Sequence, residues 1–482
     1  MKKQNTAGST PDVSLSNVTR LEGRVPLANA VPLGLQHVLA MFLANIAPMI
    51  IVAGACGLSS GETAKLIQTT LLVAGIATCI QLYPVWRVGS SLPVVMGVSF
   101  TFVTILCFIG ANYGYPTVVG AILIGGLFEG TLGLFAKYWR KIVSPIVASC
   151  VVTSIGFSLF TVGANYFGGG TGAADFGSAQ NWILGSVTLI VAILFTVFGK
   201  GFWKQLSILM GLAGGYITAL FMGAVDLSVF SEASTYAVSL PQILPFKPEF
   251  NAGAIISVCL IFLVSATETL GDTTAVAESG LHRPLSDKEL SGSICADGYC
   301  SAVSSLFGCL PVTSFSQNVG LVAMTGVVNR FTILMGALIL ILASFFNVIA
   351  AVFTTLPNAV LGGCTLLMFG QIVITGMEMI AKCGFNPRNN LISALSLTIG
   401  IGFTLVPELF NVFPVMIQNI FSSNCVAVVF VVAIVLNLIL PKEMKSANPN
   451  PELEGAVEGI EDEIHDREES RICSAALPVI PQ

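Results

Sequence analysis

Long apolar segments follow one another along most of the chain and restrict its possible folds more than any other feature. Most of them approach the ~20 residues that an α-helix needs to cross the core of a bilayer. Charged residues make up only 10% of the 482 residues, less than half the fraction usual in soluble domains. We therefore predict an all-α polytopic membrane protein. The segments lie near residues 31–53, 64–85, 92–111, 114–136, 143–163, 182–199, 206–225, 251–279, 291–308, 309–326, 331–353, 357–380, 390–406 and 422–440.

The distribution of basic residues predicts how these segments are oriented. Basic residues precede the first segment and follow the even-numbered ones, whereas only Lys65 and Lys247 fall on the opposite side. Because cytoplasmic loops carry the excess of Lys and Arg, both termini are expected in the cytoplasm and the number of spans is even. Fourteen segments would form two halves of seven. Since seven is odd, the halves would have opposite orientations in the membrane, as inverted repeats.

The net negative charge belongs to the C-terminal tail. Residues 443–482 contain ten acidic and three basic residues, a net charge of −7, so the rest of the chain carries +2 of the formal −5. The acidity therefore gives no information about a substrate. The 12 cysteines are scattered, mostly within apolar segments, and lack the spacing of metal ligands, so we expect no metal and no cofactor. Nothing in the sequence indicates binding of nucleic acid.

Two of the apolar segments are interrupted by polar residues, Pro and Gly. They are the tenth, Pro311–Gly326, and the third, Leu92–Val103. Lipid cannot satisfy so many polar groups, so both stretches must face protein or a water-filled cavity, as short extended or broken-helix segments. In inverted repeats, such segments from the two halves meet near the membrane midplane and form the binding site. A loose alignment of the two segments matches Pro93, Ser99 and Phe100 with Pro311, Ser314 and Phe315.

Ionisable side chains within spans are costly and indicate function. Glu268 and Asp272 are four residues apart and lie on one helical face. Two carboxylates at this spacing repel each other when both are ionised, which suits a site that takes up a proton. His37 in the first span and Asp297 in the ninth are further candidates, for each of which a structural role is the alternative. Glu129 in the fourth span has no evident partner, and its role stays open.

The side chain of Gln317 can recognise a heterocyclic ring. It offers a carbonyl and an amide NH2, which match a ring edge with N–H beside C=O. An ionised Glu268 could accept a hydrogen bond from a second ring N–H, and Phe100 could stack on the face of the ring. These residues form a plausible clamp for a planar oxo-heterocycle. The alternative for Gln317 is a cap on a half-helix.

At these residues the chain resembles the nucleobase–ascorbate transporter family. The signature of that family is Gln or Glu, then Asn-x-Gly, four residues and Thr, and it stands here as Gln317-Asn318-Val319-Gly320 followed by Thr325. The chain also has Gln36-His37, Glu268-x-x-Gly271-Asp272 and Ala296-Asp297-Gly298, in the order of the family, and the resemblance covers about residues 30–440.

The resemblance implies a core domain of spans 1–4 and 8–11 and a gate domain of spans 5–7 and 12–14. It implies a homodimer in the cytoplasmic (inner) membrane that works by an elevator motion, without enzymatic activity, and couples uptake to a proton rather than sodium. The implied parts are the N-terminal tail 1–28, core 29–136, gate 137–225, extracellular loop 226–250, core 251–353, gate 354–440 and the acidic cytoplasmic tail 441–482.

The resemblance also assigns roles by position. It implies that Glu268 and Gln317 bind the ring. It implies that the site is further lined by Ser99, Phe100, Phe315 and Ser316, and that coupling or site geometry depends on His37, Asp272, Asp297, Asn318, Gly320 and Thr325.

Gln317 matches the xanthine and uric acid branch, whereas the uracil branch has Glu there, and Val319 resembles urate-type members. The expected function is proton-coupled uptake of xanthine or uric acid, or of both, and a uracil permease is the alternative. An anion exchanger of similar fold is a more remote alternative. Anion sites favour positive charge, whereas the ionisable candidates within these spans are carboxylates and one histidine. An intramembrane aspartyl protease is also remote, because Thr269 stands where its Gly-x-Gly-Asp motif requires Gly.

Overall fold

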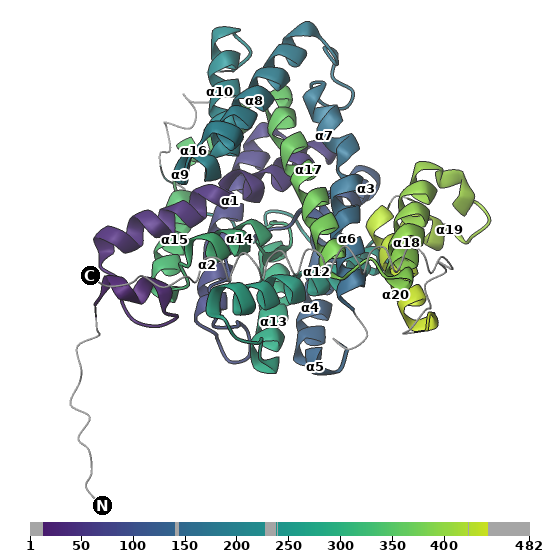
Figure 1. Cartoon of the computed structure of the whole chain (residues 1–482). Coiled ribbons are helices and arrows are strands. Elements are labelled where there is room, and N and C mark those ends of the chain that lie inside the picture. Colours follow the sequence, from purple (N-terminus) through teal and green to yellow (C-terminus); the bar gives the residue numbers. More distant parts are fainter. Residues whose placement is uncertain (1–12, 140–143, 227–237, 239, 423, 442–482) are drawn as a thin grey trace, which may run out of the picture.

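The computed structural model describes residues 13–139, 144–226, 238, 240–422 and 424–441. Within these ranges the chain is almost entirely helical (Figure 1). Residues 1–12 of the predicted N-terminal tail and all but the first residue of the C-terminal tail lie outside them, as does much of the predicted extracellular loop 226–250.

Seven helical stretches of the described residues are long and apolar enough to cross a membrane, which agrees with a polytopic fold. They are α1 (Leu27–Ala55), α2 (Ser60–Leu82), α4 (Tyr115–Leu134), α6 with α7 (Pro145–Ser158 and Phe160–Phe167), α8 (Ala179–Phe198), α12 with η3 (Ala252–Ala275 and Val276–Gly280) and α17 (Asn358–Lys382). Shorter apolar helices are η2 with α3 (Phe100–Phe102 and Val103–Tyr113), α10 (Ser207–Phe221), α15 (Arg330–Ser344) and α20 (Cys425–Ile439).

The remaining helical elements are short or more polar. They are η1 (Leu15–Thr19), α5 (Ala136–Trp139), α9 (Phe202–Gln205), α13 (Asp287–Leu306), α14 (Ser316–Thr325), α16 (Asn347–Thr354), α18 (Pro387–Leu405), η4 (Pro407–Phe410) and α19 (Val415–Phe421). The predicted segment 331–353 is therefore divided between α15 and α16, and the third and tenth segments are broken, as the sequence predicted.

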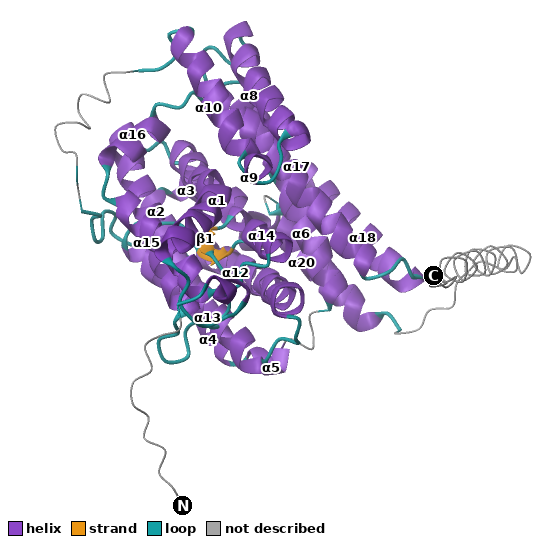
Figure 2. Cartoon of the chain, turned by 60° about the vertical axis from the view of Figure 1, so that its left-hand side comes forward, coloured by secondary structure: helices purple, strands orange, loops and turns teal. Residues whose placement is uncertain are grey.

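Each broken segment begins with a short strand and continues as a helix. Strand β1 (Met96–Val98) precedes η2 and α3, and β2 (Val312–Ser314) precedes α14. The strands pair antiparallel with Gly97 opposite Thr313, and they lie at the centre of the molecule (Figure 2). Relative to the strand ends, the loose sequence alignment is displaced by one residue at Ser99 and Phe100 and by two at Pro93. Because β1 ends at Val98 and β2 at Ser314, Ser99 corresponds to Phe315 and not to Ser314.

A two-stranded sheet has two outer edges, and in an apolar interior their backbone groups need other partners. The edge of β1 is satisfied by Thr78, whose Oγ1 accepts from Met96 N at 2.9 Å, and by Asn45, whose Oδ1 accepts from Val98 N at 2.7 Å. The edge of β2 is satisfied by the Ser301 hydroxyl, which accepts from the amide of the first β2 residue at 3.0 Å and donates to its carbonyl at 3.0 Å. Polar side chains on α1, α2 and α13 therefore hold the sheet.

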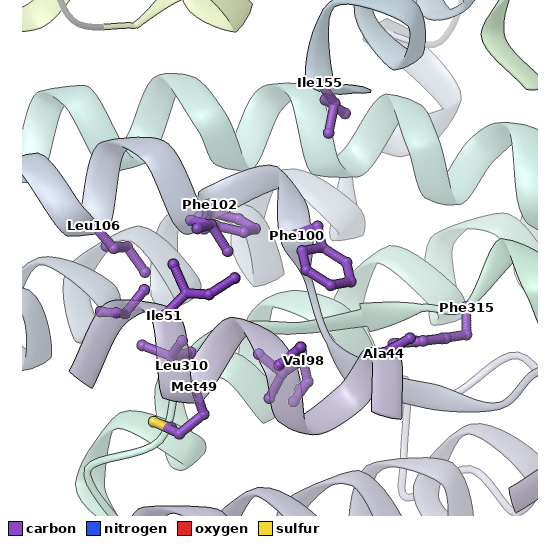
Figure 3. Close-up of a cluster of buried hydrophobic side chains, with 14 of the residues drawn as sticks. Ala44, Met49, Ile51, Val98, Phe100, Phe102, Leu106, Ile155, Leu310 and Phe315 are labelled. Carbon is purple, nitrogen blue, oxygen red and sulfur yellow. The ribbon is translucent and has the colours of Figure 1, made fainter. Parts of the chain in front are cut away.

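The helices form two packed groups. Helices α1, α2, α4, α12, α13 and α15 contact one another around the sheet, and we call them the sheet group. Helices α6, α7, α8, α10, α17, α18 and α20 form the flanking group, in which α8 lies beside α10 and α18 beside α20 (Figures 1 and 2). Buried apolar side chains connect the sheet segments to their neighbours, such as Val98, Phe100 and Phe102 with Met49 and Ile51 of α1 (Figure 3).

Part of the predicted N-terminal tail is folded against the sheet group. The Asn329 side chain donates to the carbonyls of Arg20 and Gly23 at 3.1 and 3.0 Å. The guanidinium of Arg330 pairs with Glu22 at 2.7 Å. The described part of this tail therefore caps the start of α15, because the polar groups at that helix end need partners.

Candidate functional site

A cavity of about 1010 Å³ lies where the broken segments of the sheet group face the flanking group. The sheet group contributes the ends of β1 and β2, the first turns of η2 and α14, and one position of α12. The flanking group contributes α6, α7 and α17. The lining residues from the sheet group are Val98, Ser99, Phe100, Thr101, Glu268, Thr313, Ser314, Phe315, Ser316, Gln317 and Gly320.

Glu268 brings a carboxyl group to this cavity from the middle of α12. The side chain is half-buried, and its Oε2 accepts a hydrogen bond of 2.8 Å from Thr101 Oγ1. Thr101 lies on η2, so this bond joins the third and eighth predicted spans and fixes the orientation of the carboxyl. Thr101 was not among the site residues predicted from the sequence, although it follows Ser99 and Phe100 directly.

The start of α14 forms the next part of the wall. Phe315 is the N-cap residue and is buried, and Gln317 and Gly320 are exposed toward the cavity. No side chain caps this helix, and the Asn318 amide already donates to the Phe315 carbonyl at 3.0 Å, so the backbone N–H groups of Ser316 and Gln317 are the ones that can meet a ligand. The helix dipole favours negative charge there. Gln317 and Glu268 therefore line the same cavity.

Phe100 closes one side of the cavity at the boundary between the two groups. Its ring meets Phe369 of α17 edge-on, with ring centroids 5.3 Å apart and an interplanar angle of 83°. The Ser99 hydroxyl accepts from the Thr101 amide at 3.2 Å, which caps η2. The face of an aromatic ring at this place suits a flat ligand.

Asp272 does not line the cavity, although it lies one turn from Glu268. It is buried, and its two oxygens accept hydrogen bonds of 2.6 Å from Ser314 and 2.8 Å from Ser316. Asp272 therefore holds the junction of β2 and α14 from behind. The two carboxyls share a helical face but have different partners.

Asp297 lies deeper, and it is fully buried on α13. Its Oδ2 accepts hydrogen bonds from Thr269 of α12 and, at 3.0 Å, from Thr313 of β2. Its Oδ1 has no hydrogen-bond partner among the described residues. Asp297 therefore connects α12 and the central sheet without reaching the cavity.

The remaining signature residues support α14. The amide of Asn318 donates to the His37 carbonyl at 3.0 Å and lies 3.3 Å from His37 Nδ1, so this pair joins α14 to α1. Both side chains are buried away from the cavity. Thr325 ends the helix, where its hydroxyl donates to the Leu321 carbonyl at 2.7 Å.

Helix α17 supplies polar residues to the cavity that the sequence analysis missed. Gln371, Thr375 and Glu378 line it from the flanking group. These positions gave no signal, because they follow no motif and only the packing shows which face of α17 is exposed. A second cavity of about 810 Å³ lies at the opposite end of α17, around Asn358 and Tyr166. The larger cavity lies along α17 from Leu366 to Glu378, whereas the second meets α17 only at its first residue.

Comparison with known proteins identifies the family. Residues 28–409 match the family model described as "Permease family". The chain belongs to the nucleobase–ascorbate transporter family. It is 36% identical over 411 residues to the xanthine permease of Bacillus subtilis (strain 168), which covers 84% of this chain and 92% of that protein. It is 38% identical over 385 residues to the uric acid permease PucK of the same organism, which covers 79% and 88%.

The members of this family are permeases, so the chain is a multi-pass membrane transporter and not an enzyme. Among solved structures, the transmembrane domain of a cyanobacterial bicarbonate transporter, BicA, superposes with a TM-score of 0.58. That likeness covers 83% of this chain and 97% of the domain, at 14% identity. At this identity it establishes a shared fold only.

Proposed function

We propose that this permease takes up oxopurines, xanthine or uric acid or both, and couples their uptake to protons. The observation that carries the proposal is the cavity on which Glu268, Gln317 and Phe100 converge with the free start of α14. Relatives named as xanthine and uric acid permeases support the substrate class.

Each part of the cavity matches a part of an oxopurine. The Gln317 amide can donate to a ring carbonyl and accept from the adjacent ring N–H, while Glu268 accepts from a second N–H. Phe100 faces the flat ring, and the backbone N–H groups of Ser316 and Gln317 can donate to a second carbonyl oxygen. Gln rather than Glu at position 317 supports an oxopurine over uracil, because the family resemblance assigns Gln to the xanthine and uric acid branch and Glu to the uracil branch.

Proton coupling is proposed for the pair formed by Glu268 and Asp272. The two carboxyls are one turn apart, and the ion pairs Arg283–Glu289 and Arg330–Glu22 lie elsewhere. Two unpaired negative charges at this place are unfavourable. A proton that binds before the substrate neutralises one of the two carboxyls, and this lowers the free energy needed to keep the other one ionised. Release of the purine to the cytoplasm then frees the proton, and the proton gradient drives accumulation.

The packing of the helices supports an elevator transporter. We assign the sheet group to a core domain that carries the site and the flanking group to a gate domain, within fourteen spans built as two inverted repeats. The bounds are those given above, with core 29–136 and 251–353 and gate 137–225 and 354–440. The larger cavity extends along α17 toward Lys382, on the side where basic residues predict the cytoplasm. We propose a homodimer in the cytoplasmic membrane with both termini inside.

Uptake by proteoliposomes tests the proposal. Radiolabelled xanthine should accumulate under an imposed inward proton gradient, and an uncoupler should abolish the accumulation. Excess uric acid should compete, whereas uracil and sulfate should not. Competition by uracil alone would favour the pyrimidine alternative, competition by sulfate alone would favour an anion exchanger, and accumulation that follows a sodium gradient would refute proton coupling.

A further inference from the structure

Glu129 is a carboxyl side chain on α4 that the proposed cycle does not use. It is 0% exposed, and neither of its carboxyl oxygens has a hydrogen-bond partner among the described residues. The nearby Ser265 hydroxyl is directed at Thr313, at 3.5 Å. Ser265 is the hydroxyl within reach of the Glu129 carboxyl, and a buried carboxyl group with so little hydrogen bonding is costly in its ionised form.

Two glycines bring Glu129 to Asp297. Helices α4 and α13 touch through their backbones at Gly130 and Gly298, because a Cβ added to Gly298 would lie 2.6 Å from the Gly130 Cα and 2.7 Å from the Glu129 carbonyl carbon. The Cys295 thiol also donates to the Gly130 carbonyl at 3.4 Å. Glu129 and Asp297 are the neighbours of these two glycines in sequence. The close approach therefore places the two carboxyls within electrostatic reach of each other.

One oxygen of the Asp297 carboxyl lacks a hydrogen bond that a protonated Glu129 can donate. Asp297 Oδ2 is saturated by hydroxyl donors from Thr269 and Thr313, whereas Oδ1 has no partner. The charged groups that face this pair are Glu268 and Asp272 of α12, and both are acidic. If Glu129 and Asp297 were both ionised, they would repel each other and the carboxylates of Glu268 and Asp272. Among the described residues, the charged groups that face the pair include no cation that would offset this repulsion. One proton between Glu129 and Asp297 removes one charge and gives each partner a hydrogen bond.

We propose that Glu129 carries a permanently bound proton that it shares with Asp297 Oδ1. This carboxyl pair is a second proton site, separate from the one that drives transport. Neither cavity is lined by Glu129 or Asp297, so water does not reach the shared proton through them. The Thr269 and Thr313 hydroxyls direct their hydrogens at Asp297 Oδ2, an arrangement that suits a proton and opposes a metal cation, which would need the hydroxyl oxygens turned toward it.

The shared proton gives Glu129 a positioning role. It fixes Asp297, and Asp297 in turn fixes Thr269 on the helix of Glu268 and Thr313 on β2. A neutral residue that donates one hydrogen bond at position 129 should therefore serve as well as the acid. The inference rests on the proposed function only where xanthine uptake is a readout.

Infrared spectroscopy and transport together test the proposal, with Glu129→Gln as the main variant and Glu129→Leu as the variant without a donor. The wild type minus Glu129→Gln difference spectrum should contain the C=O band of a protonated carboxyl from about pH 5 to about pH 9, a range in which an exposed Glu is ionised. The exposed Glu278 serves as a control, and Glu278→Gln should remove no such band.

Glu129→Gln should keep proton-driven xanthine accumulation within about twofold of wild type, whereas Glu129→Leu should lose most of it and melt at a lower temperature in detergent. Absence of the band would overturn the proposal. So would loss of accumulation by Glu129→Gln with intact counterflow, because Glu129 would then release its proton during transport. A requirement for sodium that disappears in Glu129→Gln would indicate a cation site and would also refute it. If wild-type protein transports neither xanthine nor uric acid, the proposed function fails, and the infrared result alone decides the role of Glu129.

Discussion

The hydrogen bond between Thr101 and Glu268 gives a direct test of how the site is organised. Valine has nearly the shape of threonine but no hydroxyl, so Thr101→Val removes the 2.8 Å bond to Glu268 Oε2 and little else. Thr101 is 5% exposed, so water does not readily replace the lost donor. The Glu268 carboxyl then loses the contact that holds its orientation toward the purine.

The size of the effect follows from the kind of bond. A hydrogen bond to a charged group contributes about 1.5–3 kcal/mol. Because Glu268 is only half-buried and can recover part of that from water in the cavity, we expect the lower half of this range. About 1.4 kcal/mol corresponds to tenfold, so the KM for xanthine should rise roughly 10- to 40-fold.

Initial rates of radiolabelled xanthine uptake, measured at matched surface expression, give this value. Thr117→Val is the matched control, because Thr117 is also buried but donates only to the Tyr113 carbonyl of the preceding turn, at 3.0 Å, and lines neither cavity. The control should leave KM unchanged. An equal KM for Thr101→Val and wild type would show that Glu268 does not depend on this bond, and the proposed clamp geometry would be wrong.

Three further substitutions test other parts of the site and the fold. Gln317→Glu should weaken xanthine and uric acid binding by about 1–3 kcal/mol, because the donor to a ring carbonyl is lost; unchanged competition constants would exclude the clamp. Asp272→Asn should preserve counterflow while reducing proton-driven accumulation at least tenfold, and accumulation that still follows the imposed pH gradient would show that Asp272 is not an essential coupling group. Burial alone would raise the pKa of Glu289, but hydrogen bonds from Arg283 and Ser286 outweigh it and lower the pKa below the usual 4.5. The stabilisation by this group is therefore complete above about pH 4.5 and is lost as pH falls through the lowered pKa, so the melting temperature of Glu289→Gln in detergent should fall less on acidification than that of wild type.

The sequence predicts the broken segments well and their pairing poorly. Pro311 and the polar residues after it cannot continue a lipid-facing helix, so an interruption there follows from composition alone. Strands of three residues are too short for the sequence to show where each one ends, which explains the displaced alignment of Ser99 with Ser314. The residues that satisfy the sheet edges, such as Thr78 and Asn45, are single polar positions on otherwise apolar helices. Their role depends on which helix face meets the sheet, and only the packing determines that.

The candidate site shows the same limit. Glu268 and Gln317 could be named because their side chains are unusual within a membrane, and Phe100 because it stands in the broken third segment; all three line the cavity. Thr101 could have been found from its place beside Phe100. Residues of α17 such as Gln371 could not, because their exposure arises where two packed groups of helices meet.

The pairing of β1 with β2 has a consequence for how the protein is made. The strands lie at residues 96–98 and 312–314, so roughly 200 further residues must be synthesised and inserted into the bilayer before β1 can pair with β2. During that interval the β1 backbone lacks the hydrogen bonds of the finished sheet, in a solvent that offers no substitute. A chain truncated before residue 312 keeps this defect permanently. Membrane quality control should therefore degrade such fragments rapidly, while chains that end shortly after α15 should survive much longer.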